Sequence, residues 1–147
     1  QLVPALPCRD PAYVERIRWL PVDNLSEEDY AREVRRSTVF LNLSMFEGLQ
    51  TSSLEAMRCG TLVAGFNGIG SREVFVGDGP AQNCITAENG DYATLAVRLE
   101  PVLKDILKND MSAWQPVLQA ALATAAPYTL EREERTLVEL WRKLLAG

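Results

Sequence analysis

The sequence predicts an α/β fold, with a Rossmann-like parallel sheet flanked by helices. Short apolar runs alternate along the chain with segments of helical periodicity, which is typical of parallel α/β proteins. The run 39–43 is almost continuously apolar, as expected of a strand covered on both faces. A chain of 147 residues suits one domain that buries roughly 70% of its unfolded surface. We therefore expect residues 1–147 to form a single domain.

The first half of the chain is expected to supply three strands and two helices. The strands are predicted at 17–20, ending at Pro21, at 39–43 and at 61–66. The first helix runs to Arg36 from Ser26, which is a typical N-cap residue and is followed by three acidic residues. The second begins near Gln50, after a glycine-containing turn, and ends at Gly60.

The second half is expected to be mostly helical. A weak strand at 84–85 and a turn at 88–90 precede a helix capped by Asp91. Its predicted apolar face contains Leu95, Leu99, Val102, Leu103 and Ile106. The next helix, 111–125, ends before Pro127 and is expected to bury Trp114, Val117, Leu118, Ala121 and Leu122. A final helix starts near Thr129 and carries Leu137, Val138, Trp141, Leu144 and Leu145 on one side. We interpret that side as core, with a docking surface as the alternative.

Composition excludes several classes of protein. A net charge of −5 argues against nucleic acid as a partner. No apolar stretch approaches the roughly 18 residues of a membrane span, and the start lacks a secretory signal, so we expect a cytoplasmic protein. The chain has no histidine, and its three cysteines form no C-x-x-C pair. These counts exclude the usual zinc sites and histidine-based catalysis and favour reduced, buried thiols.

Two acidic residues frame the most informative segment. Glu47 lies in the turn after the 39–43 strand, and seven residues separate it from Glu55 in the following helix. Helix N-terminal amides bind phosphate, and carboxylates accept hydrogen bonds from vicinal hydroxyls. This arrangement suits a sugar-bearing diphosphate. The competing interpretations are a solvated turn residue for Glu47 and, for Glu55, a capping box with Ser52.

The wider segment resembles the signature of retaining glycosyltransferases with the GT-B fold, specifically glycosyltransferase family 4. Residues 46–64 read F-E-G-L-Q-T-S-S-L-E-A-M-R-C-G-T-L-V-A, similar to the family pattern E-G-F, L-E-A-M-A-C-G-x-P-V. The glycine-rich stretch 68–73, the turn 88–91 and the segment 128–131 continue the resemblance. It covers about residues 13–147 and corresponds to the second half of the family's C-terminal, donor-binding domain.

The resemblance implies a role for each matching residue. Glu47, the candidate catalytic residue, would bind hydroxyls of the transferred sugar together with the amides of Gly48 and Leu49. Glu55 would bind the ribose. The amides of Gln50, Thr51 and Ser52 would meet the diphosphate, and the backbone of Leu20 and Val22 would face the nucleobase. Pro21, between them, replaces a usual glycine and removes an amide donor. No metal ion and no other cofactor is implied.

The resemblance also implies parts that this chain does not contain. The family's donor domain begins with two further βα units, which carry a basic diphosphate clamp, and an acceptor-binding N-terminal domain precedes it. We therefore expect the isolated chain to be inactive in glycosyl transfer. Its expected partners are a nucleotide sugar, an acceptor of unknown kind, and either a second copy or the missing N-terminal domain.

Without those units, the strand at 39–43 lacks its central neighbour. Unpaired backbone groups need a partner, so we expect another chain, or the segment Gln1–Leu6, to cover that edge. Two alternatives to a transferase remain: a non-catalytic interaction module that kept the fold, and a regulator that binds a nucleotide or sugar phosphate.

Overall fold

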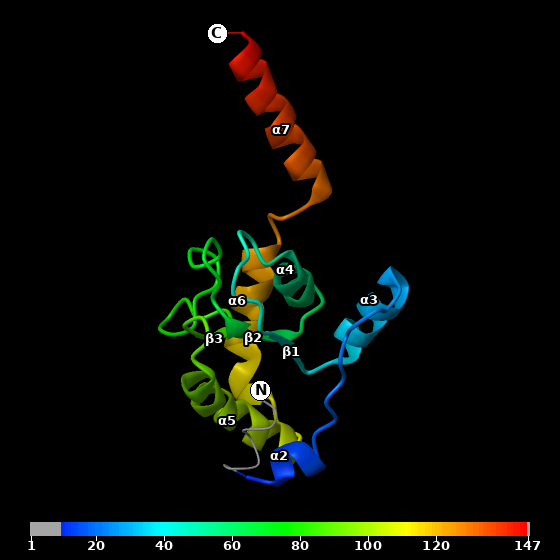
Figure 1. Ribbon diagram of the computed structural model, residues 1–147, viewed down its shortest axis with the longest axis vertical. Helices are drawn as coiled ribbons and strands as arrows, with labels where there is room; N and C mark the ends of the chain where they lie inside the picture. The colour runs from blue at the N-terminus through cyan, green and yellow to red at the C-terminus, as the bar shows by residue number, and fades with distance from the viewer. Residues whose placement is uncertain (1–9, 147) are drawn as a thin grey trace.

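The computed structural model describes residues 10–146 and confirms an α/β fold (Figure 1). In chain order the described elements are α2 (Ala12–Glu15), α3 (Glu27–Arg36), β1 (Val39–Asn42), α4 (Thr51–Arg58), β2 (Leu62–Phe66), β3 (Ile85–Ala87), α5 (Tyr92–Lys108), the 3-10 turn η2 (Ser112–Trp114), α6 (Gln115–Ala125) and α7 (Leu130–Leu145). The strands predicted at 39–43, 61–66 and 84–85 are present within one or two residues of the predicted bounds.

The described strands form one parallel sheet in the order β1-β2-β3. Val39 pairs with Leu62, and Ala64 pairs with Ile85. Every residue of the central strand β2 is buried, which explains its continuous run of apolar residues and small glycine. Strand β1 lies at one edge of the described sheet, as the sequence predicted for 39–43.

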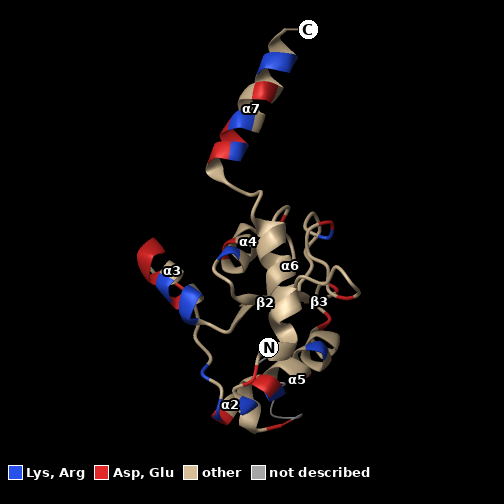
Figure 2. Ribbon diagram, turned by 180° about the vertical axis from the view of Figure 1, so that it is seen from behind, with Lys and Arg blue, Asp and Glu red and all other residues tan. Residues whose placement is uncertain are grey.

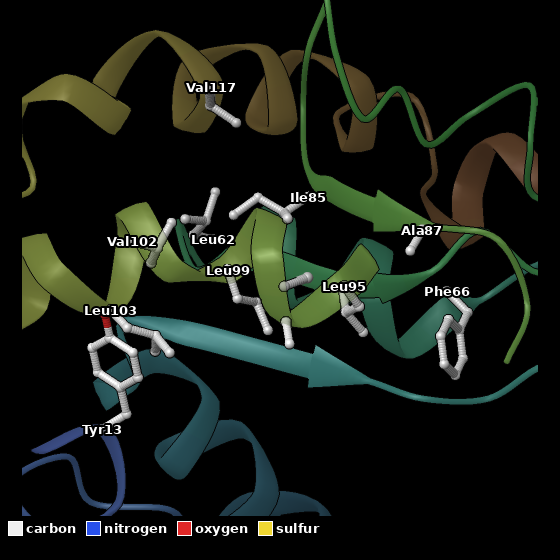
Figure 3. Packing of buried hydrophobic residues seen from close by; sticks show 12 residues of the cluster. Tyr13, Leu62, Phe66, Ile85, Ala87, Leu95, Leu99, Val102, Leu103 and Val117 are labelled. Carbon is white, nitrogen blue, oxygen red and sulfur yellow. The ribbon is translucent and has the colours of Figure 1, made fainter. Parts of the chain in front are cut away.

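Helices cover both faces of the sheet. On one face, alternate residues of β2 meet α5, α2 and the start of α6 (Figure 3). The buried members of this cluster are Tyr13, Leu62, Ala64, Phe66, Ile85, Ala87, Leu95, Ala96, Leu99, Val102, Leu103 and Val117. On the other face, a second cluster joins β1 and β2 to α3, α4 and α6, and it includes Phe40, Leu54, Met57, Val63 and Ala121.

Polar caps begin three helices where the sequence predicts them. The Ser26 hydroxyl accepts a hydrogen bond from the Asp29 amide at 3.1 Å, and the Asp91 carboxylate accepts one from the Thr94 amide at 2.9 Å. Thr129 caps α7 in the same way. At the end of α6, Arg58 donates to the Ala126 carbonyl at 3.2 Å. This basic residue therefore caps the C-terminus of that helix.

The strand predicted at 17–20 is wrong. Residues 17–26 have no helix or strand, and no described strand lies beside them. A strand needs a neighbour to satisfy its backbone groups, and four apolar-leaning residues before a proline do not impose one. Instead, the Trp19 indole nitrogen donates to the Tyr13 carbonyl at 2.8 Å, and Trp19 packs against the α5 side of the core.

The interpretation of the last helix as core is also wrong. Every residue of α7 is exposed, and Figures 1 and 2 both show α7 projecting away from the sheet. Acidic and basic residues alternate along it (Figure 2), while Leu137, Trp141 and Leu144 face no described element. Periodicity showed that this helix has an apolar face, but periodicity carries no information about what covers it. Within residues 10–146, no helix is both long enough and apolar enough to cross a bilayer.

The close approach of β1 and β2 depends on Gly65. A Cβ atom at this position would lie 1.8 Å from the Asn42 carbonyl oxygen. We expect Gly65→Ala to lower the free energy of unfolding by about 2 kcal/mol or more, because the strands must separate. Gly48→Ala is the control, since a Cβ there meets no atom within 4 Å. Urea unfolding measures both variants, and equal midpoints would contradict this account.

Acid should weaken the cap of α5. The hydrogen bond from Thr94 lowers the pKa of Asp91 below its ordinary value of 3.8. A carboxyl whose pKa is lowered by folding stabilises the native state above its unfolded pKa, and this contribution is lost as the pH falls through the folded value. We expect Asp91→Ala to melt earlier than the parent at pH 6 and to approach it below pH ~3.

The control for this cap is Asp23→Ala, because Asp23 is exposed in an irregular segment. Melting temperatures across the pH series compare the three proteins. A constant difference between Asp91→Ala and the parent at every pH would show that the cap is not titrating.

Candidate functional site

Three loops gather at the carboxyl ends of the parallel strands, the edge at which α/β sheets bind ligands. They are 43–50 after β1, 67–73 after β2 and 88–91 after β3. The Gly70 amide donates to the Glu47 carbonyl at 3.3 Å, which joins the first two loops. The Asn89 side chain donates to the Met45 carbonyl at 2.8 Å, which joins the first and third.

A buried glutamine fixes the start of α4. Gln50 is 2% exposed, and its side-chain nitrogen donates to the carbonyls of Phe66 at 3.0 Å and Ser44 at 3.3 Å. Its side-chain oxygen accepts from the Ser53 hydroxyl at 3.3 Å. The Gln50 side chain, for which the sequence predicted no role, thus fastens the β1–α4 loop to the end of β2.

The amides predicted to meet a diphosphate divide into two groups. The Gln50 amide donates to the Ser71 hydroxyl at 3.0 Å, and the Thr51 amide donates to the Leu49 carbonyl at 3.0 Å. The amides of Gly48, Leu49 and Ser52 have no hydrogen-bond acceptor among the described residues. These three remain as donors for an anion at the N-terminus of α4.

Both acidic residues of the motif keep their carboxylates available. Glu47 is half-buried in the loop, and Glu55 is exposed on α4; neither carboxylate bonds to a described residue. The capping box with Ser52 is wrong, because α4 has Gln50 as its N-cap and no side-chain cap bond. Glu55 faces the α3 side of the molecule: burial raises the pKa of Tyr30 on α3, and the Glu55 charge adds to that shift.

The structure does not bring the proposed nucleobase residues to this edge. Leu20 and Val22 lie in the irregular segment before α3, and 40% and 38% of their respective surfaces are exposed. The sequence placed them at the end of a strand that is absent. Leu20 instead lines a groove beside β1.

One ion pair in the loops was not anticipated. The Arg72 guanidinium lies 2.7 Å from a Glu88 carboxylate oxygen, and the other oxygen of Glu88 accepts from Asn67 at 3.1 Å. This pair ties the second loop to the third. The sequence marked both loops as motif segments, but it gave no spacing rule that would pair an arginine with a glutamate 16 residues later.

The remaining reactive groups lie apart from this edge. Burial raises the pKa of the Cys84 thiol to about 12, so this thiol is protonated at neutral pH. Cys59 is half-buried and also free, and Cys8 lies outside the described residues. Across residues 10–146, no group of three or more His, Cys, Asp or Glu side chains is placed to hold a metal ion.

The fold and the site together define a Rossmann-like α/β domain whose ligand loops lie at the carboxyl edge of a parallel sheet. The sequence profile of the family described as glycosyl transferases group 1 matches residues 8–105. This match covers more than half of the chain, and the protein belongs to that family. No curated protein and no solved structure gives a significant match.

The Gln50 bonds give a testable consequence. We expect Gln50→Ala to lower the free energy of unfolding by about 1–3 kcal/mol, because the buried Phe66 carbonyl and the partly buried Ser44 carbonyl lose their donor. Gln119→Ala, at an exposed position on α6, is the matched control and should change stability by less than about 0.5 kcal/mol. Chemical denaturation measures both, and similar losses for the two variants would contradict the role of Gln50.

Proposed function

We propose that this chain is the donor-binding part of a retaining glycosyltransferase with the GT-B fold, binding a nucleotide-diphospho-sugar. One observation carries the proposal. In a chain of the group 1 family, the two carboxylates of the motif bond to no described residue, and three amides that lie between them in the sequence, at a helix N-terminus, also lack a described acceptor. Such a site offers acceptors for hydroxyls and donors for phosphate.

Each group has a defined part in this proposal. Glu47 accepts hydrogen bonds from hydroxyls of the transferred hexose, and Glu55 accepts them from the ribose. The amides of Gly48, Leu49 and Ser52 face the diphosphate. As the glycosidic bond breaks, negative charge grows on the leaving diphosphate, and the N-terminus of α4 stabilises that charge.

The proposal includes the setting of the domain. Residues 1–147 act as a single domain that is part of the donor-binding domain and works without a metal ion or other cofactor, in the cytoplasm. Further βα units of the donor domain supply the basic residues that clamp the diphosphate, and an N-terminal domain supplies the acceptor site. The chain alone therefore binds its donor but does not transfer the sugar.

Thermal shift against a set of UDP- and GDP-sugars tests donor binding. A ligand at about 100 times its Kd stabilises the native state by about 2.7 kcal/mol, which should raise the melting temperature by about 5–10 °C for a chain of this size. We expect Glu55→Gln and Glu47→Gln to lose most of this shift. Their own melting temperatures should stay near the parent's, because neither carboxylate bonds to the described protein.

Glu139→Gln is the matched control, since Glu139 is exposed on α7 and should leave the ligand shift unchanged. If no nucleotide sugar shifts the parent, or if all three variants keep the full shift, donor binding at this motif is wrong. That outcome favours the non-catalytic interaction module.

A further inference from the structure

Two of the free amides before α4 belong to peptide units whose carbonyls are bonded to the loop after β2. The Glu47 carbonyl shares a peptide unit with the Gly48 amide, and it accepts a hydrogen bond from the Gly70 amide at 3.3 Å. The Gly48 carbonyl shares a unit with the Leu49 amide, and it accepts from the Ser71 hydroxyl at 3.4 Å. A trans peptide unit is planar, so its carbonyl and its amide point in opposite directions. Gly70 and Ser71 therefore set the direction of both amides.

The contact between these two loops is tight. A Cβ atom at Gly70 would lie 2.2 Å from the Gly48 carbonyl oxygen. Ser71 is fully buried, and its hydroxyl also accepts a hydrogen bond from the Gln50 amide at 3.0 Å. Because the loops touch backbone to backbone, a shift of Gly70 or Ser71 is passed directly to the peptide units that carry the free amides.

The next residue, Arg72, joins this loop to the loop after β3. Its guanidinium lies 2.7 Å from a Glu88 carboxylate oxygen and also donates to the Gly68 carbonyl at 3.3 Å. Arg72 is the single basic residue in the three loops 43–50, 67–73 and 88–91, which contain four acidic residues. It is therefore the one side chain of these loops that can hold Glu88 by opposite charge.

A third contact completes a closed set of connections among the loops. Asn89, the neighbour of Glu88, donates to the Met45 carbonyl in the loop after β1 at 2.8 Å. The first loop is thus bonded to the second, the second to the third, and the third to the first. The pair of Arg72 and Glu88 is the charged contact in this set, and without it the second loop loses an attachment beside Ser71.

We propose that Arg72 and Glu88 are positioning residues of the donor site. Their ion pair holds the second loop and, through it, the direction of the Gly48 and Leu49 amides that bind the diphosphate. This inference rests on the proposed function and deepens it. The side chains of Arg72 and Glu88 are 54% and 66% exposed, so their pair adds little to the free energy of unfolding. Its loss is therefore expected to change ligand affinity rather than the fold.

Inorganic pyrophosphate is the probe, because it carries the diphosphate without a sugar or a base. Amide NMR follows its titration into the full chain at low salt. We expect Arg72→Gln and Glu88→Gln each to weaken pyrophosphate binding about threefold to fivefold, the range that an exposed ion pair can supply. The double variant should bind no more weakly than either single variant, because the two residues act as one unit.

Three further comparisons separate positioning from other roles. In the ligand-free chain, both single variants should shift the amide signals of Gly48 and Leu49. Exchanging the charges in Arg72→Glu/Glu88→Arg should recover at least half of the lost affinity. Asp78→Asn is the matched control: it breaks an exposed ion pair with Arg98 outside the three loops and should leave both amide signals and the affinity unchanged.

Two results would overturn this inference. If Arg72→Gln weakens binding while Glu88→Gln binds as tightly as the parent, Arg72 contacts the anion directly. If neither variant shifts the Gly48 and Leu49 signals, the pair does not position these amides. A parent chain that binds no pyrophosphate would contradict both this inference and donor binding. A parent that binds pyrophosphate in the expected way but no nucleotide sugar contradicts donor binding alone.

Discussion

The hydrogen bonds of the buried Gln50 side chain hold together the parts of the molecule on which the site depends. They connect the loop after β1 to the carbonyl at the end of β2 and to Ser53 in the first turn of α4. Helix α4 can begin only where this loop is fastened, because no side chain caps it. The direction of its free amides, and hence the position of any bound anion, follows from this one side chain.

The same geometry explains why the site is made of loops from all three described strands. Parallel pairing brings the strand ends to one edge, and Gly65 lets β1 and β2 approach closely enough for their loops to meet. The bond from Gly70 to Glu47 and the ion pair between Arg72 and Glu88 then close the loops on one another. These contacts are hydrogen bonds and an ion pair, so polar interactions hold the loops together, whereas apolar packing holds the sheet.

Strand β1 contributes both to the motif shared with the group 1 family and to one edge of the described sheet. The carboxyl end of β1 leads into the glutamate motif, and the lateral edge of β1 has no described neighbour.

Rules that depend on residues close in sequence predicted much of the fold. They failed where an element depends on contact with a distant segment. Helix caps at Ser26 and Asp91 and the strand ending at Phe66 could be predicted because each depends on residues close in sequence. The strand predicted at 17–20 was wrong, since strand formation depends on a neighbour that the local sequence does not show. The apolar face of α7 was visible from periodicity, but whether anything covers it was not.

The candidate site divides in the same way. The sequence by itself determined that Glu47 and Glu55 flank a strand-to-helix turn, because that spacing is local, and it determined the family. Only the tertiary structure decided that Gln50 is a structural residue and that Leu20 and Val22 lie away from the loops. These features depend on which distant segments meet, and no local pattern encodes that.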